Sequence, residues 1–181
     1  MKLSTRGLAL VGLFAAITAV CAQISIPLPF TTVPFTLQVF AVCLAGAILG
    51  KKLGAMSQIV YLLIGAVGIP VFAGFSGGLS KIVGTSGGYL LSYPIAAFII
   101  GYVFEKRQDF AFRFISMLFG LAVIYTLGVT QLKFVGNFPW ATAFIYGAAP
   151  FIVLDIAKAF LATLVASAVI RSLKIGNMLP Y

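Results

Sequence analysis

The chain has 181 residues, of which 62% are hydrophobic and 8% are charged, and its mean hydropathy is +1.16. Soluble domains are usually about 45–50% apolar and about 25% charged, so the composition excludes an ordinary soluble protein. It predicts an all-α integral membrane protein of one domain, residues 1–181. The net charge of +9 comes from basic residues scattered between apolar segments, and without a basic patch carrying interleaved aromatics it does not indicate nucleic acid binding.

The sequence also lacks the residues that most enzyme sites need. It has no histidine, which excludes histidine-based catalysis and removes a common metal ligand. It has neither of the glycine-rich nucleotide motifs, G-x-G-x-x-G and G-x-x-x-x-G-K-[ST]. Cys21 and Cys43 lie in apolar runs without metal-ligand spacing, as small membrane-embedded hydrophobes do. We therefore expect no catalytic residue, no metal and no cofactor.

Six apolar segments follow one another along the chain, and each is expected to form a transmembrane helix. A crossing takes about 20 mostly apolar residues, and lipid offers the backbone no hydrogen-bond partner, so the crossings should be helical. Six crossings would place both termini on one side of the membrane. The segments are 7–26, 36–50 (which is short), 54–72, 88–104, 111–130 and 142–170.

The first segment follows two basic residues and resembles a cleaved signal peptide. Because five more apolar segments follow, a retained first helix is the better interpretation. This helix carries small residues at four-residue spacing, which lets membrane helices approach closely. The spacing predicts a surface for a partner protein, made of Gly12, Ala15, Ala16 and Ala19.

Two connections between segments have unusual compositions. The loop at 27–35 is rich in proline, and residues 72–89, the glycine-rich segment, contain two similar turns ten residues apart. Glycines at a helix start let backbone N–H groups approach an anion, so the glycine-rich segment is a candidate site for a carboxylate. A flexible connector is the alternative. The candidate residues are Gly78 in the first turn and Ser86, Gly87, Gly88 and Tyr89 in the second.

The basic residues predict an orientation, because cytoplasmic flanks of membrane proteins are enriched in lysine and arginine. With both termini inside, nine basic residues flank the inner ends of the segments. Only Lys81 and Lys133 lie in outer connections. We therefore expect cytoplasmic termini, with the proline-rich loop and the glycine-rich segment on the outer side.

An acid and a base stand three positions apart in the last segment, within the stretch FIVLDIAKAFLAT. Asp155 and Lys158 would share a helix face about halfway down the membrane or somewhat above. A charge at mid-bilayer costs about 2.5–3.5 kcal/mol on insertion scales, so such residues usually face a cavity or the protein interior. Three interpretations stay open: a pair that ties the helix to a neighbour, a polar anchor for a ligand, and a proton-coupling site at Asp155.

Several separated stretches together resemble the BioY family, the biotin-binding S components of energy-coupling-factor (ECF) vitamin importers. The resemblance covers nearly the whole chain, in order and at the family's spacing. Its stretches are PLPFTTVPFTLQ at 27–38, LAGAILG at 44–50, SQIVYLLIGAVGIPVFAG at 57–74, SGGYL at 86–90 and DIAK at 155–158.

The resemblance implies an ECF S-component fold with six helices, cytoplasmic termini and a biotin pocket beneath a lid formed by the first loop. It implies ligand contacts from Asp155, Lys158 and the region 74–89. It also implies that Phe30 and Phe35 of the lid close over the thioether ring of biotin. Through small residues of the first helix, carried over to Ala15 and Ala19, it implies a transmembrane coupling subunit served by two ATPases.

The leading hypothesis from the sequence is a bacterial plasma-membrane subunit that captures biotin outside the cell and is not itself an enzyme. A proton-coupled secondary transporter of a carboxylate-bearing solute, using Asp155, is the alternative. A membrane enzyme or a non-transporting scaffold is a third possibility, which the absence of a nucleophile–base constellation disfavours.

Overall fold

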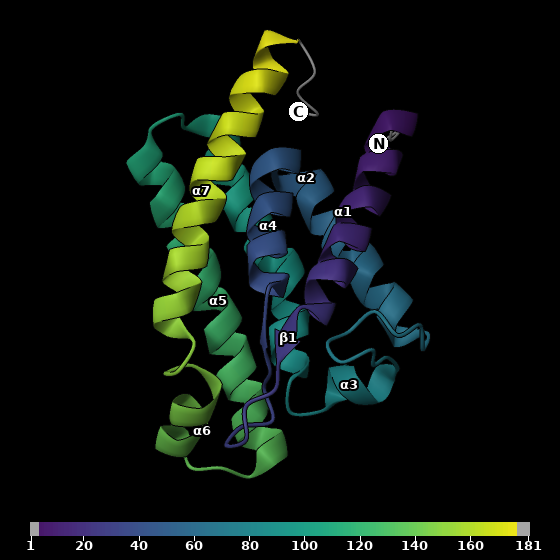
Figure 1. The fold of residues 1–181 in the computed structure, drawn as a ribbon, viewed down its shortest axis with the longest axis vertical. Helices are drawn as coiled ribbons and strands as arrows, with labels where there is room; N and C mark the ends of the chain where they lie inside the picture. Colours follow the sequence, from purple (N-terminus) through teal and green to yellow (C-terminus); the bar gives the residue numbers. More distant parts are fainter. Residues whose placement is uncertain (1–3, 177–181) are drawn as a thin grey trace.

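The computed structural model describes residues 4–176, which form seven helices and one two-stranded ribbon. The start of α1 (Thr5–Gln23) and the end of α7 (Ile152–Ile175) lie at the same end of the molecule (Figure 1). The ribbon, α3 (Leu79–Val83) and α6 (Trp140–Gly147) gather at the opposite end. The irregular parts of the chain are therefore concentrated at one end of a helical bundle.

Five of these helices are long and apolar enough to cross a membrane: α1, α2 (Gln38–Ala66), α4 (Gly87–Lys106), α5 (Phe110–Gly136) and α7. Large apolar side chains point outward along the outer helices, and Phe119 of α5 and Leu161 of α7 are 62% and 52% exposed. Outward-facing apolar side chains suit a lipid environment, and the chain is a multi-pass membrane protein.

The second and third expected segments, 36–50 and 54–72, correspond to the two halves of the single element α2, which reverses direction at Gly50. Gly50 has φ 77° and ψ 177°, a conformation that favours glycine. The Nε2 of Gln38 donates to the Tyr61 hydroxyl at 2.6 Å, so the halves on either side of Gly50 lie antiparallel. The second half ends at Ala66 and not at residue 72 as expected, because Gly68 at φ 102° turns the chain.

The last expected segment, 142–170, is wrong as a single helix. It is divided into α6 and α7 by residues 148–151, which include Pro150. Proline lacks the N–H that a helix interior needs and disfavours helical backbone in the residue before it. Because α7 begins at Ile152, Asp155 stands in its first turn rather than about halfway along a crossing helix.

A short antiparallel ribbon, which the sequence did not predict, frames the proline-rich loop. Strand β1 (Ser25–Ile26) pairs with β2 (Phe35–Thr36), with Ser25 opposite Thr36 and Ile26 opposite Phe35. The backbone N–H of Leu37 also donates to the Ile24 carbonyl at 3.2 Å. Residues 27–34 therefore form a loop whose two ends lie side by side, one shortly after α1 and the other shortly before α2.

Candidate ligand-binding site

A cavity of about 220 Å³ lies at the end of the bundle that carries the ribbon. A buried water needs only about 10–15 Å³ of such space, so the cavity has room for a small organic molecule. Its walls come from residues 27–39, the glycine-rich segment, α4, α5 and α7. Its lining residues include Val39, Phe72, Ala73, Ser76, Lys81, Ser86, Tyr89, Leu90, Tyr93, Ile124, Tyr125, Phe151, Asp155 and Lys158.

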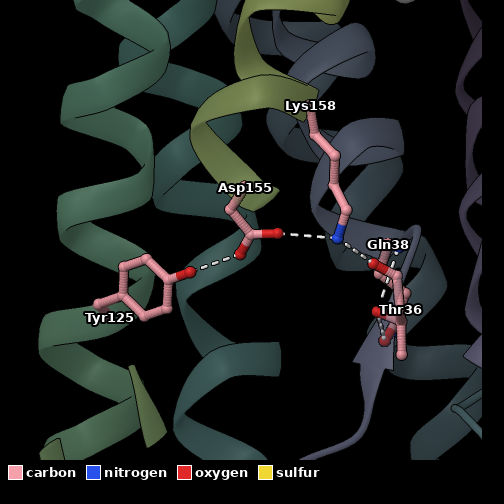
Figure 2. Close-up of polar contacts among 5 residues, drawn as sticks. All are labelled: Thr36, Gln38, Tyr125, Asp155 and Lys158. Carbon is pink, nitrogen blue, oxygen red and sulfur yellow. Dashed lines mark hydrogen bonds and ion pairs between the residues drawn. The ribbon is translucent and has the colours of Figure 1, made fainter. Parts of the chain in front are cut away.

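The acid and base singled out in the sequence form an ion pair at this cavity (Figure 2). The Nζ of Lys158 lies 2.8 Å from Oδ1 of Asp155, and the two residues are 9% and 5% exposed. The partial positive charge at the start of α7 also favours a carboxylate in its first turn. Pairing and helix position together offset part of the desolvation cost of burying two charges.

A tyrosine that the sequence did not single out completes the carboxylate's surroundings. The Tyr125 hydroxyl of α5 donates to Oδ2 of Asp155 at 2.5 Å. Each carboxylate oxygen therefore accepts one hydrogen bond within the protein and keeps a further lone pair. Because Asp155 and Tyr125 both line the cavity, a ligand N–H can still reach this carboxylate.

Besides Asp155, the ammonium group of Lys158 contacts two residues of β2. It donates to the Thr36 carbonyl of β2 at 2.6 Å and lies 3.6 Å from the centroid of the Phe35 ring. The Phe35 ring in turn stacks on Phe151 with 6.4 Å between centroids. A lysine has three N–H donors, and the bonds to Asp155 and Thr36 use two of them, so one is left for a ligand acceptor.

Polar contacts continue from Thr36 into α2 (Figure 2). The Thr36 hydroxyl donates to Oε1 of Gln38 at 3.1 Å, and Nε2 of Gln38 donates to the Tyr61 hydroxyl. Tyr61 donates onward to the Val71 carbonyl at 3.1 Å. A hydrogen-bonded chain therefore joins Asp155 to the loop that follows α2, through buried side chains.

The helix start predicted at the second turn is confirmed, because Gly87 and Gly88 are the first two residues of α4. Both are buried, and neither lines the cavity. A Cβ on Gly87 would collide with the Ile82 carbonyl, and one on Gly88 would collide with the Leu127 carbonyl of α5. The Gly87 N–H donates to the Gly84 carbonyl. The structure therefore explains both glycines by close approach of neighbouring backbone, and their ligand contacts stay a prediction.

The remaining predicted residues of the region divide between the cavity and its surroundings. Ser86 and Tyr89 line the cavity, and the Tyr89 hydroxyl donates to the Gly147 carbonyl at 2.8 Å. Gly78 precedes α3 with φ 93° and does not line the cavity. Phe30 is 51% exposed and lines a neighbouring hollow with Tyr146. For Gly78 and Phe30, a direct ligand contact stays a prediction.

The small residues of α1 do not share one face. Ala15 is 2% exposed and packs in the core, and Ala19 is partly buried against the same core. Gly12 and Ala16 are exposed, and a Cβ on Gly12 would meet no atom within 4 Å. A partner could therefore touch Gly12 and Ala16 directly, while Ala15 belongs to the inner side of the helix.

Sequence reasoning missed several residues that shape the site, namely Thr36, Gln38, Tyr93, Tyr125 and Phe151. Thr36 and Gln38 lie in the stretch at 27–38 that carries the family resemblance, but no role was assigned to them, and each of the five becomes part of the site because distant segments meet. Tyr125 was visible only as a tyrosine within an apolar segment. Among residues 4–176, no group of three or more His, Cys, Asp or Glu residues could hold a metal.

The fold and the site define a class of protein: a helical membrane protein with a ligand cavity at one end and a buried ion pair on the cavity wall. The chain matches the model of the BioY family over residues 1–175. It is 48% identical over 165 residues to a probable biotin transporter BioY of Pyrococcus horikoshii, covering 91% of this chain and 96% of that one. It is 45% identical over 161 residues to a biotin transporter BioY of Thermotoga maritima, covering 89% and 94%.

A crystal structure of the S-component for biotin from an ECF-type ABC transporter has a similar fold. The TM-score is 0.85 at 29% sequence identity, covering 92% of this chain and 91% of that one. The chain belongs to the BioY family. The family recognised in the separated motifs of the sequence is therefore confirmed.

Proposed function

We propose that the chain is the biotin-binding membrane subunit of an ECF importer, which takes biotin from outside the cell and passes it inward. Family membership supports this function, and one observation of the site carries it chemically. The buried Asp155–Lys158 pair faces a cavity and keeps both acceptor and donor capacity. The subunit is a transport protein and not an enzyme, and biotin is its cargo rather than a cofactor.

The chemistry of biotin matches this wall of the cavity. Its ureido ring presents two N–H donors and a carbonyl acceptor on one edge. Asp155 accepts from an N–H group, and Lys158 donates to the carbonyl, with Tyr125 holding the carboxylate in place. The apolar thioether ring lies against aromatic and aliphatic lining such as Phe151 and Leu90. Labelled-biotin binding to the purified wild-type protein tests the function, and absence of saturable binding would exclude it.

The carboxylate at the other end of biotin requires a second polar contact. Apart from Lys158, Lys81 of α3 is the basic residue in the cavity lining, and it is exposed to solvent. We assign the carboxylate to Lys81. Ser86 lines the same cavity and adds a hydroxyl donor. This arrangement places the two ends of the ligand against different walls.

Replacing Lys81 with alanine should weaken biotin binding about fivefold, since an exposed ion pair contributes up to about 1 kcal/mol. Binding of biotin amide, which has no charge at that end, should change little. Competition of both compounds against labelled biotin measures the two affinities. An equal loss for biotin and for its amide would contradict the assignment.

For the membrane topology, we place both termini in the cytoplasm and count six crossings, with α2 contributing two. The reversal at Gly50 supports this count. The strong bias of basic residues toward the end that carries the start of α1 and the end of α7 supports the orientation. Each half of α2 is shorter than a full crossing of about 20 residues. Irregular backbone next to each half spans the rest of the membrane thickness. Such backbone is tolerated where other parts of the protein cover it.

The partners would be a transmembrane coupling subunit and two ATPases, because the chain has no nucleotide motif of its own. The structure similar to this one is described as part of an ECF-type ABC transporter. The exposed small residues of α1, Gly12 and Ala16, provide a surface where a partner helix can approach closely. The alternative, a proton-coupled transporter using Asp155, is not favoured by these comparisons.

A double substitution, Gly12→Leu with Ala16→Leu, should leave biotin binding intact and abolish co-purification with the coupling subunit. Both positions are exposed, so larger side chains fill only the space that a partner would occupy. Pull-down from cells that express the whole transporter measures assembly, and labelled-biotin binding serves as the control. Normal assembly of the double variant would contradict the assignment of this surface.

A further inference from the structure

The glycine-rich segment is attached to the end of α1 by a single side chain. Gln23, the last residue of α1, places Nε2 3.3 Å from the Val71 carbonyl and 3.2 Å from the Phe72 carbonyl. Its Oε1 accepts the backbone N–H of Phe75 at 2.9 Å. One half-buried amide therefore supplies both a donor and an acceptor to a stretch about 50 residues away in sequence.

The backbone that Gln23 contacts needs such support. Phe75 has φ 52° and Gly74 has φ 68°, and a left-handed conformation is unfavourable for a residue other than glycine. Phe72 and Ser76 exchange two backbone hydrogen bonds around this turn. Phe72, Ala73 and Ser76 line the cavity. The turn that Gln23 holds is therefore a wall of the ligand cavity.

A second glutamine holds the other flank of the same segment. Nε2 of Gln131, on α5, donates to the Ile82 and Gly84 carbonyls at 2.8 Å each. A Cβ on Gly87 would lie 2.6 Å from this nitrogen, and one on Gly88 would lie 2.8 Å from the Gln131 Cβ. The two glycines of the G-G-Y motif thus leave the space that the Gln131 side chain occupies.

The geometry points to Gln23 and Gln131 as positioning residues that fix the glycine-rich segment as a wall of the ligand cavity. This inference rests on the proposed function, because it names biotin as the ligand that the wall retains. The segment is therefore not a free connector, because side chains of α1 and α5 hold both of its flanks. It is an irregular stretch held by two amides, one at the turn before α3 and one at the turn after it.

An uncharged amide suits both positions. The groups to be bound are backbone carbonyls, which need N–H donors, and at Gln23 also an N–H, which needs an acceptor. A carboxylate could not donate to these carbonyls, and an ammonium could not accept from Phe75. The two amides do not indicate a partner surface or a charged ligand, because every hydrogen-bond partner of both side chains is a backbone atom of the same chain.

Gln23 also stands where the two walls of the cavity meet. The chain runs from Gln23 through Ile24 into β1, and the Ile24 carbonyl accepts from the N–H of Leu37. Strand β1, which leads into the proline-rich loop, therefore begins two residues beyond the side chain that holds the glycine-rich segment. A displacement at the end of α1 would reach both walls together.

The test is the dissociation rate of labelled biotin from purified Gln23→Met and Gln131→Met variants. Methionine keeps the length of the side chain but cannot donate, so the wall should loosen and dissociation should accelerate about tenfold in each variant. Gln58→Met is the matched control. Gln58 is buried and joins α2 to Thr18 of α1, yet it lies outside the cavity lining.

Thermal unfolding and amide hydrogen exchange separate positioning from general stability. The control should keep the wild-type dissociation rate whichever way its thermal stability changes, whereas Gln23→Met should accelerate exchange of the Phe75 N–H. Wild-type dissociation rates in both glutamine variants, or equal acceleration in Gln58→Met, would overturn the inference. If a methionine variant does not fold, the near-isosteric glutamate variant, which also lacks the donor, is measured instead. Failure of the wild type to bind biotin would reject the proposed function together with the positioning role.

Discussion

Replacing Lys158 with methionine is expected to lower the affinity for biotin by about 100-fold or more. The substitution removes the donor for the ureido carbonyl and leaves Asp155 as a buried carboxylate without its cation. Removing one partner of a buried ion pair typically destabilises the folded protein by about 3–5 kcal/mol. The lost hydrogen bond from a charged donor to the ligand contributes about 1.5–3 kcal/mol, and 100-fold in affinity corresponds to about 2.7 kcal/mol. Equilibrium binding of labelled biotin to the purified variant measures the loss.

The double variant Asp155→Asn with Lys158→Met separates binding from folding. It removes both charges, so most of the stability lost in Lys158→Met should return while the affinity stays low. Thermal unfolding without ligand gives the stability, and the same binding assay gives the affinity. Wild-type affinity in both Lys158→Met and the double variant would show that biotin does not bind at this pair.

Replacing Gly88 with alanine is expected to destabilise the protein and to weaken biotin binding at least about tenfold. The added methyl group would meet the Leu127 carbonyl and the Gln131 side chain, and backbone cannot yield as a flexible side chain can. Overpacking of this kind typically costs about 1–3 kcal/mol and occasionally more. Because Ser86 and Tyr89 flank Gly88 and line the cavity, the shift of α4 against α5 would also distort the site.

Gly12→Ala is the control for this prediction. Gly12 is also helical, but its added methyl group would meet no atom within 4 Å, and alanine is favoured over glycine in a helix by about 1 kcal/mol. Gly12→Ala should therefore be as stable as wild type or more stable. Thermal unfolding and biotin binding of Gly12→Ala and Gly88→Ala test the prediction. Equal behaviour of the two variants would contradict the packing role of Gly88.

Much of the helical architecture could be predicted from apolar segments alone, because lipid forces crossing segments to be helical. The expected 7–26, 88–104 and 111–130 correspond to α1, α4 and α5 with shifted ends. The last segment was wrong because hydropathy continues across Pro150, while the helix does not. The ribbon was missed because two-residue strands depend on a partner strand nine residues away and leave no periodic pattern.

The ion pair itself could be predicted, since Asp155 and Lys158 are unusual residues at helical spacing in an apolar run. The residues that contact this pair could not be predicted. Tyr125, Thr36 and Phe35 reach the pair only through the packing of α5, β2 and α7, and hydropathy does not specify which helices meet. For Gly87 and Gly88, too, the local sequence does not specify which segments pack against them. Glycines at a helix start fit an anion site and close packing equally well, and only the packing of neighbouring segments against α4 shows that close approach requires glycine at both positions.

In the proposed complex, biotin occupies the cavity with its ureido ring at Asp155 and Lys158. Native mass spectrometry of the protein purified from cells grown with biotin tests this most directly, with the Lys158→Met variant prepared in parallel. We expect the wild type to release one molecule of biotin per chain and the variant to release none. A wild-type protein that carries no biotin, or a variant that retains biotin as fully as the wild type, would contradict it.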